Sequence, residues 1–230
     1  MKHVIKYYDE LAESYDENRF ENSYGRYIDL LERNILNEWL GSEDKNHVID
    51  LGCGTGRLLE YAMTGVDGSR KMLQIAAKKF PDRTLIQANL TNIPLPNNFI
   101  NSAICFQVLM HLDIKTIQAF FESTAHIIPK RGRLIIDIPS KPRRSMGRRS
   151  LSGWHGDTSA SIKDVESWIE PHWKIMRWRG ILFFPIHRIP QRLRPLFINM
   201  DAWLGETWLA KYSSYYVLEL VRLSWTFAAV

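Results

Sequence analysis

The 230 residues are enough for one α/β domain, and a hydrophobic content of 45% allows a sizeable core. Two cysteines exclude a disulfide scaffold and are typical of a reducing cytoplasm. A formal net charge of +5 is too mild to indicate a nucleic-acid-binding protein by itself. No N-terminal apolar region is typical of a signal peptide, and no uncharged apolar run reaches the ~18 residues of a membrane helix. We therefore expect a cytoplasmic domain.

The N-terminal third is predicted to be helical and the middle third to alternate strands with helices. Residues 6–40 have apolar and aromatic side chains at helical spacing, and Gly41 is expected to end the last helix. Ser69 and Asp113 are expected N-caps of two later helices. The predicted strands are 48–51, 63–66, 84–88, 100–106 and 133–138, and the predicted helices between them are 69–79 and 114–127. This alternation predicts parallel βαβ units.

The pattern changes after residue 139. The basic run 141–149 is broken by glycine and proline, so we expect a surface loop there. Residues 161–169 are predicted to be helical, and residues 174–179 and 215–223 to be the last two strands. Between those strands, residues 181–211 form a long insert of aliphatic, aromatic, proline and arginine residues.

A glycine motif follows the first predicted strand directly. Gly52, Gly54 and Gly56 alternate with other residues, and residues 57–61 are expected to begin a helix. Glycine accepts a positive φ and lets a ligand lie against the backbone, so a strand, glycine turn and helix start are typical of a nucleotide site. The spacing is not that of the dinucleotide fingerprint, and no Lys-Ser/Thr pair of a phosphate-binding loop follows. A tight connection without a ligand is the alternative.

The segment 47–57 resembles motif I of class I S-adenosylmethionine (SAM) dependent methyltransferases, with Asp50 at the acidic position of that motif. The resemblance covers about residues 6–140 and is to enzymes that modify quinones and other small molecules. It implies a single Rossmann-like α/β domain over residues 1–230, with a mostly parallel seven-stranded sheet, an antiparallel last strand and helices on both faces. It also implies N-terminal lid helices at about 1–41, SAM as cofactor, S-adenosylhomocysteine as product and no metal.

The same resemblance assigns cofactor contacts. Asp67, at the end of the second strand, would accept hydrogen bonds from both ribose hydroxyls. Asn89 and Leu90 would contact adenine, with Asn89 in place of the usual aspartate. The other implied cofactor contacts are Tyr15, Arg19, Asp50, Gly52, Cys53, Gly54, Gly68, Ser69, Met72, Phe106 and Gln107. Because the interval from Gly56 to Asp67 is short for the family, we expect a first helix of about two turns or a shortened second strand.

Two histidines are candidate bases. Methyl transfer from SAM needs an acceptor held about 3–3.5 Å away and in line, and it needs a base only when the acceptor must lose a proton. His111 follows the fourth strand, where ligands collect in such folds; its alternative role is packing or capping at a helix start. His155 lies between two glycines and could face the acceptor or lie in a surface turn.

We expect methyl transfer to an oxygen or nitrogen of a small molecule in a biosynthetic pathway. The alternatives are a lipid or quinone C-methyltransferase at a membrane surface and a SAM-binding protein without catalysis. No recognition domain for tRNA or protein is visible in the sequence, and nucleic acid is not an expected partner. The oligomeric state is expected to be a monomer or a homodimer.

Two segments leave the partners open. The run 141–149 can be a solvated loop, a clamp for an anionic substrate, or a contact for RNA or acidic lipid; its lack of aromatic residues argues against single-stranded nucleic acid. The insert 181–211 can be a substrate lid, an interfacial helix for peripheral membrane contact or a dimer surface. We expect it to be a packed helical cap over the pocket.

Overall fold

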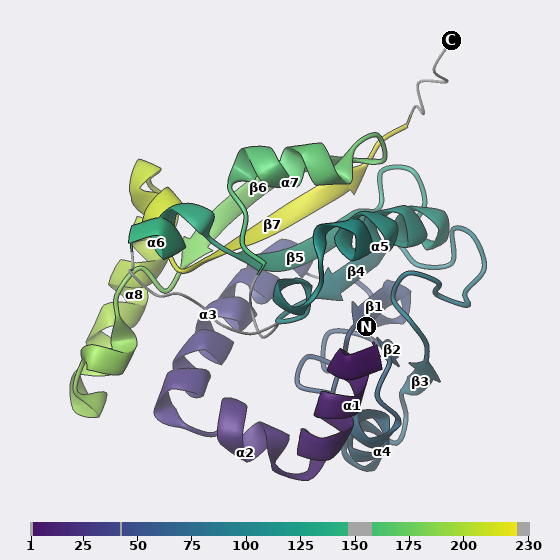
Figure 1. Cartoon of the computed structure of the whole chain (residues 1–230), viewed down its shortest axis with the longest axis horizontal. Helices are drawn as coiled ribbons and strands as arrows, with labels where there is room; N and C mark the ends of the chain where they lie inside the picture. Colours follow the sequence, from purple (N-terminus) through teal and green to yellow (C-terminus); the bar gives the residue numbers. More distant parts are fainter. Residues whose placement is uncertain (1, 42, 147–157, 225–230) are drawn as a thin grey trace.

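The computed structural model describes residues 2–41, 43–146 and 158–224, so His155 lies outside the described residues. A seven-stranded sheet runs through the molecule (Figure 1). Its strands are β1 (Val48–Leu51), β2 (Thr64–Asp67), β3 (Thr84–Gln87), β4 (Ser102–Cys105), β5 (Arg133–Pro139), β6 (Trp173–Ile181) and β7 (Tyr215–Arg222). The order is β3-β2-β1-β4-β5-β7-β6. The pairs among β1 to β5 are parallel and β7 is antiparallel to both of its neighbours, which confirms the predicted Rossmann-like fold.

Helices cover both faces of this sheet. The α-helices are α1 (Lys2–Leu11), α2 (Tyr15–Arg19), α3 (Ser23–Leu40), α4 (Arg70–Lys79), α5 (Ile114–Ile127), α6 (Lys141–Met146), α7 (Ile162–Ile169) and α8 (Arg194–Leu204). The short 3-10 helices are η1 (Ala12–Ser14), η2 (Lys45–His47), η3 (Leu109–His111), η4 (Ile186–Arg188), η5 (Gln191–Leu193) and η6 (Trp208–Tyr212). As predicted, Ser69 caps α4 and Asp113 caps α5: each side chain accepts a hydrogen bond from the amide three residues later.

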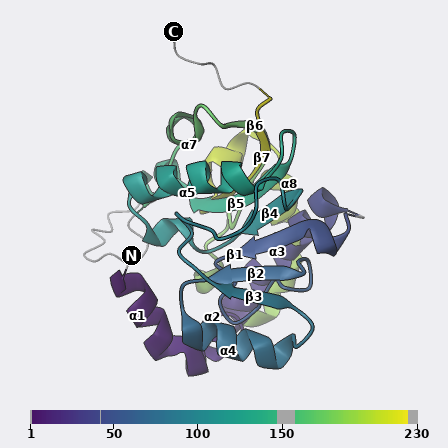
Figure 2. The ribbon, with the colours of Figure 1, turned by 90° about the vertical axis from the view of Figure 1, so that its right-hand side faces the viewer.

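Two apolar layers hold the helices to the sheet. One layer contains α5 and α7, with buried Phe120, Phe121 and Trp168. The other contains α3 and α4, with Leu36 and Ala76 fully buried. The strands β1 and β4 are buried at every position because both faces of the sheet are covered. Figure 2 shows β3 and α4 at the opposite end of the molecule from β6 and α7.

The predicted helix at residues 57–61 is wrong. The chain from residue 54 to residue 60 forms consecutive turns, with hydrogen bonds from Leu59 N to Gly56 O (3.2 Å) and from Tyr61 N to Leu58 O (3.0 Å). Gly52, Gly54 and Gly56 all have positive φ, at 78°, 53° and 90°. These turns use up the few residues available before β2 begins at Thr64, so no helix forms in between.

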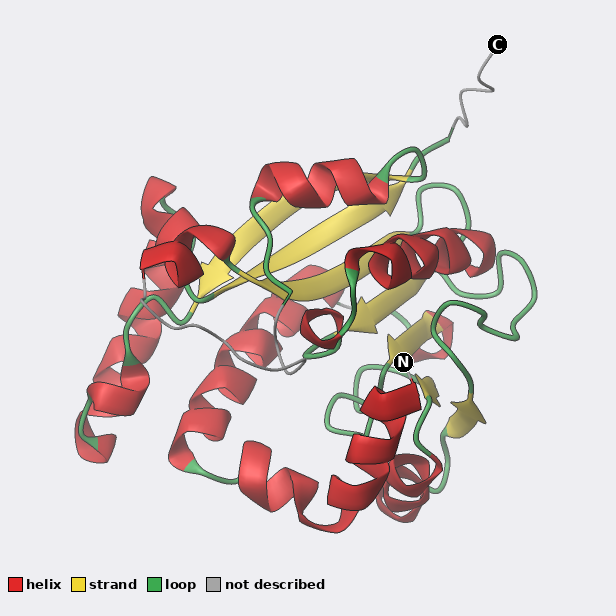
Figure 3. Cartoon of the chain, viewed as in Figure 1, coloured by secondary structure: helices red, strands yellow, loops and turns green. Residues whose placement is uncertain are grey.

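The basic run is not a loop throughout. Residues 141–146 form α6 (Figure 3), and residues 147–149 lie outside the described residues. Ser140 lies directly before the helix, and its hydroxyl oxygen accepts a hydrogen bond from Arg143 N at 3.2 Å. A serine in this position satisfies a free amide at the helix start, and this favours a helix despite Pro142 in the first turn.

The insert 181–211 is helical, as predicted, but it does not cover the pocket described below. Its main helix, α8, packs against α3 and β6. Tyr27 of α3 donates a hydrogen bond to buried Asp201 of α8 (3.3 Å), and Arg194 donates to Ser23 (2.6 Å). No helix in the described ranges is long and apolar enough to span a membrane.

Candidate active site

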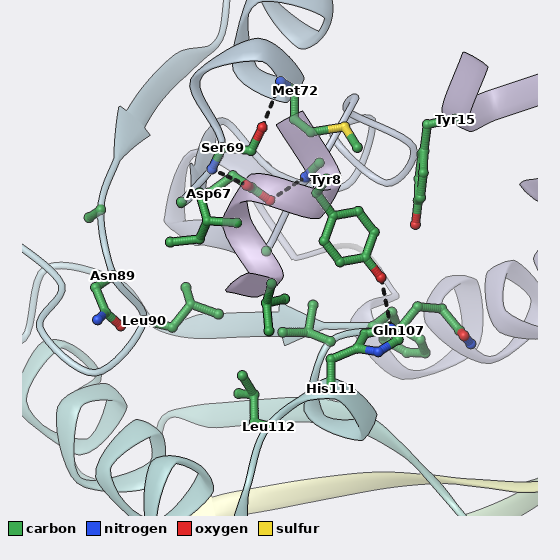
Figure 4. A pocket seen from close by; sticks show the side chains of 18 residues that line it. Tyr8, Tyr15, Asp67, Ser69, Met72, Asn89, Leu90, Gln107, His111 and Leu112 are labelled. Atoms are coloured by element: carbon green, nitrogen blue, oxygen red, sulfur yellow. Dashed lines mark hydrogen bonds between the residues drawn. The ribbon is translucent and has the colours of Figure 1, made fainter. Parts of the chain in front are cut away.

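A pocket of about 110 Å³ lies at the carboxyl ends of the parallel strands (Figure 4). Its lining comes from α1 and from the segments that follow β1, β2, β3 and β4. In open α/β sheets, ligands bind at this edge, beside the point where the strand order changes direction. In this sheet that point lies between β1 and β4. The predicted residues that line it are Tyr15, Gly52, Gly54, Asp67, Gly68, Ser69, Met72, Asn89, Leu90, Phe106, Gln107 and His111. Most of the predicted site is therefore brought together.

The glycine turn forms one wall of the pocket. A Cβ on Gly52 would lie 2.4 Å from a methyl group of Val108, so only glycine fits that position. A Cβ on Gly54 would meet no described atom within 4 Å. Gly54 lines the pocket, so its missing side chain leaves backbone open to the cavity.

Asp67 is fixed beside this turn by backbone amides. Its Oδ2 accepts from Gly54 N–H at 2.9 Å, and its Oδ1 accepts from Ser69 N–H at 2.7 Å (Figure 4). Burial raises the pKa of Asp67, while the two amides act in the opposite direction. A carboxylate has about four acceptor sites, so acceptor capacity remains for a ligand hydroxyl.

Asn89 follows β3 and lines the pocket, but its side-chain oxygen is already engaged. It accepts from Thr91 N and from Thr91 Oγ1, both at 3.0 Å. This local turn differs from the simple adenine acceptor that the sequence implies, because a ligand amine would have to share that oxygen. The neighbouring Leu90 is buried and adds an apolar surface to the same wall.

Helix α1 closes the pocket from above the strand ends. The Tyr8 hydroxyl lies 2.8 Å from His111 Nε2, and the Tyr8 ring also packs edge-on against Tyr15 with centroids 5.7 Å apart. Burial raises the pKa of Tyr8, so the phenol keeps its proton, and the tautomer of His111 decides which of the two groups donates the hydrogen bond. Asp9, next in α1, accepts a hydrogen bond from Ser69 Oγ at 2.5 Å and ties the helix to the start of α4.

Gln107 connects the pocket to a buried acidic cluster. Its backbone has a φ of 60°, and its N–H donates to Asp137 Oδ1 at 2.7 Å. Its side-chain amide donates to Glu32 Oε1 (2.7 Å) and to Asp137 Oδ2 (2.9 Å). Burial raises the pKa of both carboxyl groups, and Arg57 pairs with Glu32 at 2.7 Å. The cluster thus holds Gln107 in one orientation at the pocket wall.

Three predicted cofactor contacts do not line the pocket. Asp50 is buried under the turn, where burial raises its pKa to about 7. Cys53 points towards β2, since a Cβ on Gly65 would lie 2.8 Å from its sulfur. Arg19 lies in the last turn of α2, outside the lining.

The sequence did not single out six lining residues. These are Val4, Ile5, Tyr8, Ala88, Val108 and Leu112. The family resemblance implied an N-terminal lid, but it did not show which face of that helix would meet the pocket. The positions 4, 5 and 8 lie on one helical face, and this spacing was the available signal.

The comparisons with known proteins agree with this arrangement. Residues 49–136 match a family described as a methyltransferase domain. Over these residues, which run from β1 to β5, the chain is similar to methyltransferases. A solved structure from Thermotoga maritima, described as a SAM-dependent methyltransferase and possible histamine N-methyltransferase, covers 95% of this chain and 99% of its own with a TM-score of 0.65 and 14% identity. At that identity the likeness shows the methyltransferase fold alone.

Two relatives match this chain over part of its length. An uncharacterized protein of Methanocaldococcus jannaschii, MJ1252, is 35% identical over 115 residues, which are 49% of this chain and 43% of that protein. The demethylmenaquinone methyltransferase of Thermotoga maritima is 28% identical over 158 residues, which are 64% of this chain and 67% of that enzyme. The match therefore spans less than half of the first relative and about two thirds of the second.

Proposed function

We propose that the pocket binds SAM and that the protein transfers its methyl group to a small-molecule acceptor. The observation that carries the proposal is the pairing of Gly54 and Asp67, which presents bare backbone and a fixed carboxylate to the same cavity. The remaining acceptor capacity of Asp67 suits a ribose hydroxyl. Met72, Leu90 and Phe106 supply apolar surface of the kind that an adenine ring packs against.

SAM, when bound, supplies a methyl carbon that is already activated by its sulfonium charge. The residues of the chain then have to hold the acceptor in line and keep water out. Tyr8 and Tyr15 shield the pocket from the side of the N-terminal helices. Nε2 of His111 would take a proton from an acceptor oxygen or nitrogen that replaces the Tyr8 hydroxyl as its hydrogen-bond partner, and until then the contact with Tyr8 holds the ring.

A second candidate is transfer to a carbon of a quinone-type ring. It is supported by the similarity to the enzyme described as demethylmenaquinone methyltransferase. The same His111 would then take the proton from the ring carbon after the new bond has formed. The two candidates share the SAM pocket and differ in the acceptor atom.

The experiment is incubation of the full chain with SAM carrying a deuterated methyl group and an extract of the source organism, followed by mass spectrometry. We expect one or more small molecules to gain the labelled methyl group, and fragmentation of the product identifies the acceptor atom. His111→Ala serves as the matched variant, because it should bind SAM and form much less product. Bound SAM without any labelled product would contradict the transferase proposal, and the absence of SAM binding would contradict the cofactor proposal as well.

A further inference from the structure

Helix α8 exposes a continuous apolar face. Leu193, Leu196, Met200 and Trp203 have 47%, 72%, 43% and 65% of their surface exposed. They lie three or four residues apart, so they project from one side of the helix. Another side of the helix is buried: Phe197 and Ile198 pack against the core, and Asp201 is fully buried. A solvated helix normally carries polar residues on its outer face, so this stripe is unusual.

Two nearby elements also expose large apolar side chains. Helix η6 contacts both α8 and α6, and its Trp208 is 74% exposed. Helix α6, which also contacts η6, ends at Met146, and this residue is 66% exposed. We call the exposed apolar residues of α8, η6 and α6 together the α8 surface. The α8 surface contains residues of the insert 181–211 and of the basic run that begins at residue 141. The sequence alone did not settle the role of either segment.

The α8 surface is flanked by cations. Arg188, Arg192 and Lys211 are exposed, and Lys211 Nζ lies 5.7 Å from the centre of the Trp208 ring. Within residues 181–211 the acidic residues are Asp201 and Glu206. Asp201 is buried, and Glu206 pairs with Arg179 at 3.1 Å. Within residues 181–211 the exposed charge is therefore predominantly positive.

We propose that the α8 surface docks on an anionic phospholipid bilayer. Tryptophan side chains favour the boundary between headgroups and acyl chains. The leucine and methionine side chains beside them would insert into the bilayer to the same depth, as the apolar face of an interfacial helix does. The flanking arginines and lysine complement anionic headgroups. In a symmetric dimer the same patch faces itself, which would bring these cations together, so the charges favour a bilayer over a second copy.

The test is cosedimentation of the full chain with vesicles of phosphatidylcholine and with vesicles that also contain phosphatidylglycerol. We expect binding to the anionic vesicles, weakened by salt, and a loss of roughly tenfold or more in affinity for the double variant Leu196→Glu/Trp203→Glu. Both side chains are largely exposed, so this variant should keep the wild-type melting temperature. Arg188→Gln/Arg192→Gln should weaken binding to anionic vesicles and reduce its dependence on salt.

The matched control is Phe99→Glu, which adds a charge at a 50% exposed aromatic residue on the loop before β4. It should bind vesicles as the wild type does. Wild-type protein that stays in solution with both vesicles, or a double variant that still binds, would overturn the proposal. A dimer that the double variant dissociates, without vesicle binding, would assign the surface to a second copy and also overturn it. The assay does not depend on SAM, so its outcome is separate from that of the proposed function.

Discussion

The hydroxyl of Tyr8 lies 2.8 Å from Nε2 of His111, and this contact joins the N-terminal helix to the segment after β4. The two residues are 103 positions apart in the sequence. Their bond therefore depends on the closure of α1 over the strand ends. It places the candidate base and the lid in one hydrogen-bonded unit at the pocket.

Replacing His111 tests its role as a base. His111→Ala should lower kcat by about 10²- to 10⁴-fold, the usual contribution of a positioned base, and should change SAM affinity much less. Tyr8→Phe keeps the ring packing and removes only the hydrogen bond, so its loss should be smaller. Steady-state kinetics with the acceptor, together with calorimetry for SAM, separates the two effects. If His111→Ala has the turnover of the wild type, His111 is not the base of the reaction.

Gly54 tests the placement of the cofactor against the backbone. The Cβ of Gly54→Val would enter open space in the pocket, so SAM binding should be lost for steric reasons. The positive φ of 53° also costs a non-glycine residue roughly 1–2 kcal/mol, so a moderate fall in the free energy of unfolding should accompany it. Urea unfolding and SAM calorimetry on the same sample measure both. A folded Gly54→Val that binds SAM normally would mean that the ligand lies elsewhere.

Asp50 gives a prediction for pH. Burial raises its pKa from 3.8 to about 7, so between these values the folded protein holds a proton that the unfolded chain has lost. The contribution of Asp50 to stability therefore falls as pH rises through this window and is constant above it. Asp50→Asn removes the titration, so the difference in unfolding free energy between variant and wild type should shift in favour of the variant from pH 4 to pH 7. A difference that does not vary with pH would contradict the assigned burial of the carboxyl group.

Gln107 is predicted to be intolerant of a negative charge. Gln107→Glu replaces the amide that donates to Glu32 and Asp137 by a third carboxyl group. The loss of donors among buried acids should lower the free energy of unfolding by about 3 kcal/mol or more. Gln118→Glu, at an exposed position of α5, is the matched control and should change it little. Equal urea midpoints for the two variants would contradict the described cluster.

The sequence predicted the parts of the fold that follow from local pattern. The strand at residues 48–51 and the capped helices α4 and α5 have the predicted positions, because apolar runs and N-caps act through nearby residues. The turns at residues 54–60 were missed because a short connection, rather than helix propensity, decides that segment. Tyr8 was missed as a site residue because its contact with His111 depends on tertiary closure.

The insert 181–211 also shows that local pattern does not predict tertiary contacts. Its composition indicated helices correctly, yet the buried partner of α8 is α3, fixed by contacts such as that of Tyr27 with Asp201. A pattern of apolar residues does not say which surface they cover. The exposed Leu196 and Trp203 therefore became visible as an unpartnered face only in the folded chain.

The measurement that tests the central claim most directly is calorimetric titration of SAM into the wild type and Asp67→Ala. We predict one site per chain in the wild type and an affinity at least about tenfold weaker in the variant, because hydrogen bonds from a ligand to a buried carboxylate are lost. Asp82→Ala, which removes an exposed aspartate, should bind as the wild type does. Wild-type protein that does not bind SAM, or a folded Asp67→Ala with unchanged affinity, would contradict a SAM site built on Asp67.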